Sequence, residues 1–295
     1  MPNLKTLKQR INSVKATKKI TSAMKMVATS SLRRYQEKLA NVIPFAQGVE
    51  NDVKALKDFL SLKEAIPSII KGRTPHKSHL LLIFSADRGL CGNYNMLLFQ
   101  FVLRKINALH KEGVATHIVC LGHKVASLLN LLSHTQPTEI FTLNYKALYA
   151  SLLPVAYYLT FLFKEGKIDS CSTYFMKFVS ALVSNPTSYD LIPFSPQHTY
   201  ENKESAPVSP RCLFGVEPDA HTFLPTAAFF NIITQLQFAA IEGKASEESA
   251  RMVAMDNATR NAEDMIDKLE LLYNRTRQAY ITKELIEIIS GAEAL

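Results

Sequence analysis

The amino-acid sequence predicts an α/β protein in which two long terminal helices pair as an antiparallel coiled coil, with an open, mainly parallel, Rossmann-like α/β domain inserted between them. Proline is absent from residues 3–43 and 226–295, although the chain holds 13 prolines. Apolar residues in both stretches recur at steps of three and four, the spacing of one helical face. Between these stretches, strand-like runs alternate with helix-like runs, which is typical of a parallel sheet.

The composition excludes two broad classes of protein. A chain of 295 residues that is 47% hydrophobic and 20% charged can bury a sizeable core, so intrinsic disorder is excluded. No apolar run reaches the ~18 residues of a membrane-spanning helix, because Pro154 interrupts the best candidate at 148–163. An integral membrane protein is therefore not expected.

The net charge of +8 is concentrated at one end of the chain. Residues 1–40 contain ten basic residues and one acid, whereas residues 241–295 contain 7 basic and 11 acidic residues. A basic, acid-poor start is also found in mitochondrial presequences and in nucleic-acid-binding arms. The first is disfavoured because the apolar spacing continues far beyond a removable leader. The second is disfavoured because no aromatic residue lies among the charges from Lys5 to Arg34.

The first expected element is a long helix followed by a linker, at residues 1–75. The helix itself should cover 3–43, where no proline occurs. A polar interruption that includes Lys18 and Thr21 divides its apolar face. The apolar face consists of Leu4, Leu7, Ile11, Val14, Ile20, Met24, Val27, Leu32, Tyr35 and Leu39.

The second expected element is an α/β domain at residues 76–214. Strands are predicted at 79–85, 118–121, 140–143 and 172–179, and helices at 96–110, 124–132 and 147–163. Beyond Asn185, frequent prolines indicate loops and an edge strand.

The third expected element is a coiled-coil helix at residues 215–295, which is proline-free from 226 onward. Its seam should consist of Met255, Ala258, Ala262, Met265, Leu269, Leu272, Thr276, Ala279, Lys283 and Ile286. An exposed seam needs a partner, and the two ends of the chain carry opposite net charge. The ends should therefore pair with each other, and the polar breaks at Lys18, Thr21 and Lys283 should not face the partner helix.

One stretch invites an enzymatic hypothesis, namely Ser85 to Asn95, which lies between a strand and a helix. Its glycines match neither the dinucleotide-binding nor the P-loop pattern. Cys91 at the helix start could be a nucleophile, with Asp87 orienting a base. The simpler interpretation, a tight turn in which Asp87 or Asn93 caps the helix, is favoured.

No other pattern points to bond chemistry. The four cysteines, at 91, 120, 171 and 212, are too far apart in sequence for a zinc or redox motif. The acidic pairs Glu247–Glu248 and Glu263–Asp264 are interpreted as solvated helix surface. We therefore expect no catalytic residues, no metal and no cofactor.

Three separated segments carry a family resemblance. The start, from Pro2 to Ala28, and the finish, Ala250 to Ala262 followed by Tyr280 to Ala294, resemble the gamma subunit of F-type ATP synthases. The turn from Ser85 to Gly92 is similar to the same family's Ser-Asp-Arg-Gly-Leu-Cys-Gly element, here with Ala86 after the serine.

The resemblance implies a noncatalytic rotor shaft that couples proton flow through a c ring to ATP synthesis or hydrolysis at beta subunits. It implies alpha, beta, epsilon and c-ring partners and a membrane association made only through the complex. The expected location is the cytoplasmic face of a bacterial inner membrane or the matrix face of the mitochondrial inner membrane. The subunit contacts implied by the resemblance are Lys18, Met24, Lys25, Arg33, Arg34, Arg277, Gln278, Thr282 and Glu284.

Overall fold

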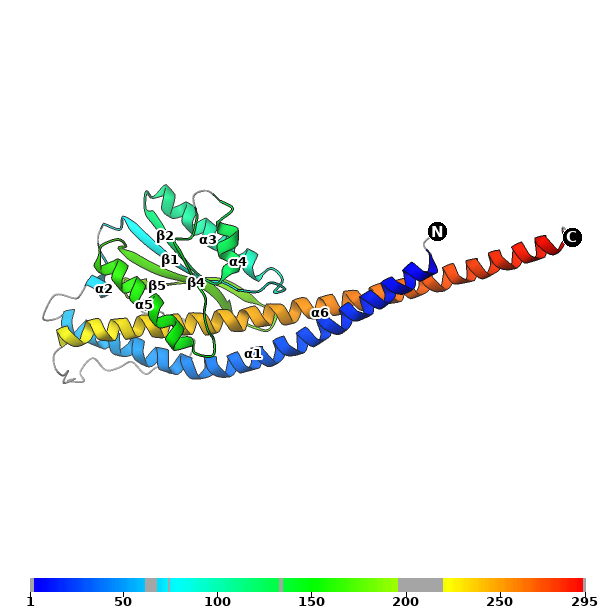
Figure 1. Cartoon of the computed structure of the whole chain (residues 1–295). Coiled ribbons are helices and arrows are strands. Elements are labelled where there is room, and N and C mark those ends of the chain that lie inside the picture. The colour runs from blue at the N-terminus through cyan, green and yellow to red at the C-terminus, as the bar shows by residue number, and fades with distance from the viewer. Residues whose placement is uncertain (1–2, 62–67, 74, 133–134, 196–219, 294–295) are drawn as a thin grey trace. The chain divides into compact units, whose positions relative to one another are not determined.

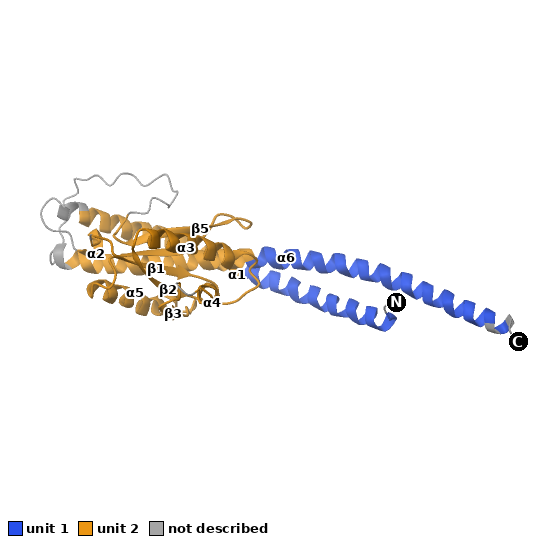
Figure 2. Ribbon diagram, turned by 90° about the horizontal axis from the view of Figure 1, so that it is seen from above, with its two compact units in different colours: residues 1–30, 251–295 blue, residues 31–250 orange. Residues whose placement is uncertain are grey.

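The computed structural model describes residues 3–61, 68–73, 75–132, 135–195 and 220–293. These residues form two compact units (Figure 2). Unit 1 comprises Met1–Ser30 and Arg251–Leu295, and unit 2 comprises Ser31–Ala250. The first and last helices belong partly to each unit, and each unit is described here by itself.

The described elements alternate helix and strand through the middle of the chain (Figure 1). In chain order they are α1 (Leu4–Ser61), α2 (Ser68–Lys71), β1 (Ser78–Phe84), α3 (Tyr94–Lys111), β2 (Ala115–Leu121), α4 (His123–Leu129), β3 (Glu139–Phe141), α5 (Leu148–Lys164), β4 (Ser170–Phe178), β5 (Ser184–Ile192) and α6 (Ala220–Glu293).

The five strands of unit 2 form one sheet in the order β3-β2-β1-β4-β5. The first four strands are parallel, and β5 pairs antiparallel with β4 at the edge. Each parallel connection contains a helix, as a crossover requires. The predicted open, mainly parallel α/β domain between terminal helices is confirmed.

Both faces of the sheet are covered (Figure 1). Successive residues of a strand point to opposite faces, so Leu80 and Leu82 pack with α5 and α6, while Leu81 and Ile83 pack with α3 and α4. The part of α1 that belongs to unit 2 also packs on this sheet. Its residues Leu39 and Ile43 contact the cluster that Leu80 and Leu82 form with α5 and α6. Near-continuous burial of β1 and β4 follows from this double cover.

Both terminal helices are longer than the proline pattern predicts. α1 continues through Pro44 to Ser61, and α6 begins before Pro225. A proline inside a helix removes one backbone hydrogen bond, a cost that packing can offset. Val53, which follows Pro44 in α1, and Leu224, which precedes Pro225 in α6, are both fully buried in one cluster within unit 2. Their packing therefore stabilises the helical residues on the far side of each proline.

In unit 1 the two helices run antiparallel, with Leu7 and Ile11 packed against Leu269 near the start of α1. Part of the predicted seam is wrong by one residue. Ile20, Val27, Met265 and Leu272 are exposed, and their neighbours Thr21, Ala28, Ile266 and Tyr273 are the buried or half-buried residues. Small residues such as Ala28 and Thr21 let the helices approach closely, which larger branched side chains would prevent.

Among the described residues, only α6 is long and apolar enough to cross a membrane. Its most apolar 18-residue window has a mean hydropathy of 1.3, and 67% of that window is buried within the protein. Such burial is what a core helix shows.

The turn after β2 supplies a stability test. Gly122 has a φ of 110°, and a Cβ there would overlap the Ser85 carbonyl oxygen and lie 2.8 Å from Ser85 Oγ. We expect Gly122→Ala to lower the free energy of unfolding by about 3 kcal/mol in urea denaturation. Gly113→Ala is the matched control, because Gly113 has a φ of 73° with open space around it. The control should cost only about 1 kcal/mol, and equal losses in both variants would contradict the clash.

Candidate functional site

Three groups of residues form the candidate functional site. The first group joins α1 and α6 in unit 1, the second is the far end of α6, and the third fixes α6 to the sheet in unit 2. Most of these side chains lie on α1 and α6, and the buried faces of these helices determine which side chains face one another.

In unit 1, lysines of α1 pair with acids of α6. Lys15 Nζ lies 2.6 Å from Glu270 Oε1, Lys18 Nζ lies 2.8 Å from Glu263 Oε1, and Lys25 Nζ lies 2.6 Å from Asp256 Oδ1. As the residue number rises along α1, the number of its partner in α6 falls, so all three pairs fit a single antiparallel register. The hydrogen bond from Lys25 is the main cause that holds the pKa of Asp256 below its ordinary value, with Arg260 adding to it.

Two of these contacts correct sequence-based expectations. Lys18 and Thr21 do not face away from the partner helix, because Lys18 pairs with Glu263 and the Thr259 hydroxyl donates to Thr21 Oγ1 at 2.8 Å. Glu263 and Asp264 are both exposed, so the interpretation of this acidic pair as solvated helix surface is confirmed, and Glu263 also pairs with Lys18. The polar interruption of the α1 pattern is thus matched by polar residues of α6, which a single-helix pattern cannot reveal.

The last part of α6 is exposed from residue 277 to 290. α1 begins at Leu4, and its first core contacts reach Leu269 and Tyr273, so the helix beyond these contacts lacks this cover. Large apolar side chains remain exposed there, namely Tyr280, Ile281, Leu285, Ile286, Ile288 and Ile289. A surface of this composition is typical of a protein interface.

The residues proposed for subunit contact fall in two places. Arg277, Gln278, Thr282 and Glu284 are all exposed on the end of α6. On α1, Met24 is half-buried, while Arg33 is exposed and lies 3.6 Å from Glu37. Arg34 is also exposed, with its guanidinium 5.4 Å from the centre of the Tyr35 ring. Their roles stay predictions.

In unit 2, hydroxyl groups fix α6 to the α/β domain. Tyr94 of α3 donates a hydrogen bond from its hydroxyl to the Gly243 carbonyl at 3.0 Å. Ser246 donates to the Met176 carbonyl of β4 at 2.8 Å, and Ser249 to the Ala181 carbonyl at 2.6 Å. Ser246 is fully buried. These bonds set both the position and the rotation of α6 against the sheet.

Two acids near these serines differ from the sequence-based interpretation. Glu247 and Glu248 are buried, not solvated, and both pair with Lys244, at 2.8 Å and 3.4 Å. Lys244 also lies 5.2 Å from the centre of the Tyr145 ring. Burial, with Glu247 as the next cause, raises the pKa of Tyr145 well above its ordinary value. These ion pairs could have been predicted from the sequence, because Glu247 and Glu248 follow Lys244 by three and four residues and such residues share a helical face.

Glu242 is a further buried acid of the same turn. Burial raises its pKa to about 7, although Lys177 and the Phe178 backbone N–H favour the charged form. Its Oε2 atom has no hydrogen-bond partner among the described residues. Burial therefore favours the protonated form of this carboxyl group.

The turn from Ser85 to Asn95 has a structural role. Cys91 is 2% exposed and its sulfur accepts a hydrogen bond from Asn95 Nδ2 at 3.2 Å. Asp87 accepts from the His123 backbone N–H at 3.3 Å, so it binds the first residue of α4 and not α3. The α3 cap residue, Asn93, makes no side-chain capping bond. The expected capping of the following helix is wrong, and the turn instead ties the ends of β1 and β2 together.

The cysteines carry no mark of redox or metal chemistry in the described part of the chain. Burial raises the pKa of the Cys120 thiol to about 12 and also raises that of Cys171, so both are protonated. Cys212 lies outside the described residues. Within the described ranges, no three His, Cys, Asp or Glu residues gather closely enough to hold a metal ion.

Comparison with known proteins matches the whole chain. A sequence model described as ATP synthase matches residues 3–295. The ATP synthase gamma chain of Beijerinckia indica is 40% identical over 304 residues, and the match covers 100% of both chains. This chain belongs to the ATP synthase gamma-chain family.

Two solved structures share the gamma-chain fold seen here. A chain in the central stalk and c-ring structure of Tetrahymena thermophila mitochondrial ATP synthase gives a TM-score of 0.60 at 21% identity, with 81% of this chain and 99% of that chain covered. A chain in the rotor of Euglena gracilis mitochondrial ATP synthase gives 0.63 at 15% identity, with 94% and 98% covered. At these identities the likeness is one of fold.

The paired register of this gamma chain predicts a specific disulfide. Because the Thr21 and Thr259 hydroxyl oxygens are 2.8 Å apart, sulfurs at these positions would lie within bonding reach. We expect Thr21→Cys combined with Thr259→Cys to crosslink under mild oxidation, seen as a shift on non-reducing gel electrophoresis. Thr21→Cys with Asn257→Cys is the control, since Asn257 is exposed on another side of α6. Preferential crosslinking of the control pair would contradict the register.

Glu242 gives a test by pH. Because burial raises its folded pKa from 4.5 to about 7, the protein loses stability as pH rises through this window. Glu242→Gln should remove that loss and raise the free energy of unfolding by about 3 kcal/mol at pH 8, with little change at pH 4.5. Denaturation at both pH values checks this. The control is Glu112→Gln at an exposed site, and the same pH dependence in both variants would refute the assignment.

Proposed function

We propose that the chain is the noncatalytic central rotor shaft of an F-type ATP synthase. In this proposal it couples proton flow through a c ring to conformational cycling, and so to ATP synthesis or hydrolysis, at beta subunits. ATP chemistry takes place on those subunits, and this chain carries the rotation.

One observation supports this function above the others. α6 is unbroken from Ala220 to Glu293. Near its middle, Ser246 and Ser249 are bound to backbone carbonyls of the α/β domain, while the segment 277–290 is exposed. A continuous helix held at one segment can transmit rotation to another, because its backbone hydrogen bonds resist unwinding. The exposed apolar end fits a surrounding sleeve of subunits.

The proposed partners follow from the family. Alpha and beta subunits would enclose the end of α6, where Arg277, Gln278, Thr282 and Glu284 are exposed, and the residues Lys18, Met24 and Lys25 of α1. The α/β domain, with Arg33 and Arg34, would face the c ring beside epsilon. Membrane association would occur through the complex, on the cytoplasmic face of a bacterial inner membrane or the matrix face of the mitochondrial one.

Reconstitution tests the function. The purified full chain alone should show no ATPase activity, and adding it to alpha and beta subunits of an ATP synthase should restore cooperative turnover. Failure of the chain to copurify with those subunits would overturn the proposal.

A pair of variants sharpens the reconstitution. Ala262→Arg should abolish assembly, because Ala262 is 7% exposed in the seam and a buried unpaired charge costs about 3 to 5 kcal/mol. Asn261→Arg adds the same charge at the exposed neighbouring position and should assemble normally. The yield of complex after gel filtration separates the two, and equal yields would show that the paired helices do not govern assembly.

A further inference from the structure

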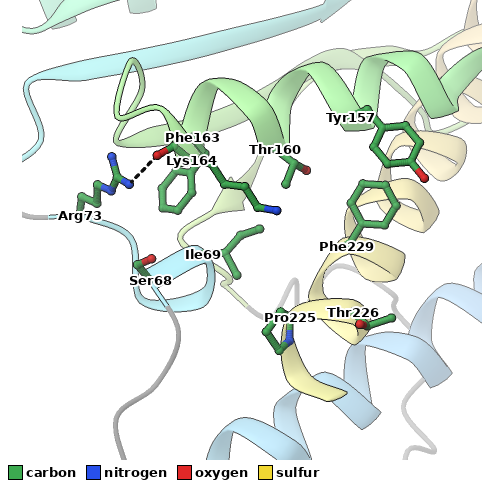
Figure 3. Close-up of a pocket in the computed structure, with 10 residues that line it drawn as sticks. All are labelled: Ser68, Ile69, Arg73, Tyr157, Thr160, Phe163, Lys164, Pro225, Thr226 and Phe229. Atoms are coloured by element: carbon green, nitrogen blue, oxygen red, sulfur yellow. Dashed lines mark hydrogen bonds between the residues drawn. The ribbon is translucent and has the colours of Figure 1, made fainter. Parts of the chain in front are cut away.

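Unit 2 contains a pocket of about 550 Å³ that no part of the proposed function uses (Figure 3). Its walls come from α2, the residues just after it, the second half of α5 and the start of α6. It lies away from the turn at 85–95 and from the serines that hold α6 to the sheet. A pocket of this volume is large enough for a small organic ligand.

Two cationic side chains line the pocket, Arg73 at one end and Lys164, whose side chain reaches past the Phe163 ring toward Ile69 (Figure 3). Neither forms an ion pair with a described residue. The Arg73 guanidinium lies 4.8 Å from the centre of the Phe163 ring and donates to the Lys164 carbonyl at 3.4 Å (Figure 3). Stacking and this bond hold the guanidinium in place while leaving other N–H groups for an anion.

The surroundings of Arg73 are shaped for this position. Gly166 follows α5 with a φ of 70°, and a Cβ there would lie 2.8 Å from Arg73 Nη1. Asp169 accepts hydrogen bonds from the backbone N–H groups of Lys77 and Ser78 at 2.9 Å and 3.0 Å, and these bonds, with Arg73 adding to them, hold its pKa below its ordinary value. The guanidinium therefore has space, a fixed orientation and no bound carboxylate among the described residues.

The other end of the pocket is apolar and aromatic. Phe229 of α6 and Tyr157 of α5 have ring centres 5.0 Å apart, and Ile69 and Pro225 complete this wall (Figure 3). Tyr157 is 62% exposed, which is a large aromatic surface left open. A ligand covering this end would be favoured because it removes this apolar area from water.

From this arrangement we propose that the pocket binds an amphiphile with an oxyanion head and an alkyl tail. The head binds where Lys164 reaches into the pocket, with Arg73 supplying a second positive charge at the pocket's end, and the tail lies against Phe229 and Tyr157. An arginine fork binds phosphate or carboxylate through two parallel hydrogen bonds. The hydroxyl residues Ser68, Thr160 and Thr226 also line the pocket, and hydroxyl groups can donate to an oxyanion head. A membrane phospholipid and a free fatty acid share this chemistry.

The test uses the full chain, which contains no tryptophan. Phe229→Trp places one fluorophore in the pocket wall. The control is Phe99→Trp, which places the fluorophore in α3, on the other face of the sheet. Dodecyl phosphate below its micelle concentration should change the emission of the Phe229→Trp variant saturably and leave that of the Phe99→Trp variant unchanged. Inorganic phosphate and neutral dodecyl maltoside should each bind at least tenfold more weakly, because each supplies half of the ligand.

Charge variants in the Phe229→Trp background locate the head. Arg73→Gln and, separately, Lys164→Gln should weaken dodecyl phosphate binding at least tenfold, and because Lys164 is exposed its loss should not disturb folding. Lys167→Gln removes the same charge outside the pocket and should have no effect. Laurate binding as tightly as dodecyl phosphate would indicate a fatty acid, and capture by phosphatidic acid vesicles but not phosphatidylcholine vesicles would indicate a lipid. A response equal in both reporters, or unchanged by Arg73→Gln and Lys164→Gln, would overturn the proposal.

Discussion

The burial of α6 in unit 2 is the interaction on which the rest of the structure depends. Ile232, Ile233, Leu236, Phe238 and Ala239 of this helix are all buried in the same cluster as the sheet. Each large side chain contributes roughly 1.5 to 3 kcal/mol when it leaves water. Hydrophobic burial alone is not directional, so the bonds from Ser246, Ser249 and Tyr94 are what define how the helix is rotated on the sheet.

Unit 1 is held together by a different kind of interaction. Its seam contains small and polar residues, such as Ala28, Thr21 and Thr259, and its ion pairs are partly exposed. Exposed pairs contribute about 0 to 1 kcal/mol each, so they fix register more than they add stability. Pairing of this kind leaves the outer faces of α1 and α6 available to other chains, as a shaft requires, whereas the sheet of unit 2 is enclosed by its own helices.

The architecture is predictable because proline placement and hydrophobic period are local properties of the sequence. The α/β order, the parallel sheet and the antiparallel terminal helices all follow from them. The register of the seam is not predictable, because Met265 and Ile266 are both apolar and only the partner helix selects between them. Pro44 wrongly predicts the end of a helix because the pattern contains no information on the distant packing of Val53. The bond from Ser246 joins segments far apart in the chain, so no spacing rule could locate it.

The central claim is that this chain rotates as the shaft of an ATP synthase. The most direct measurement attaches an optical probe at an exposed position of the α/β domain, such as Lys111→Cys, in a complex whose alpha and beta subunits are fixed to a surface. With ATP present, the probe should turn continuously in one direction, at a rate set by ATP concentration. Sustained ATP hydrolysis by the same complexes with a stationary probe would contradict the account.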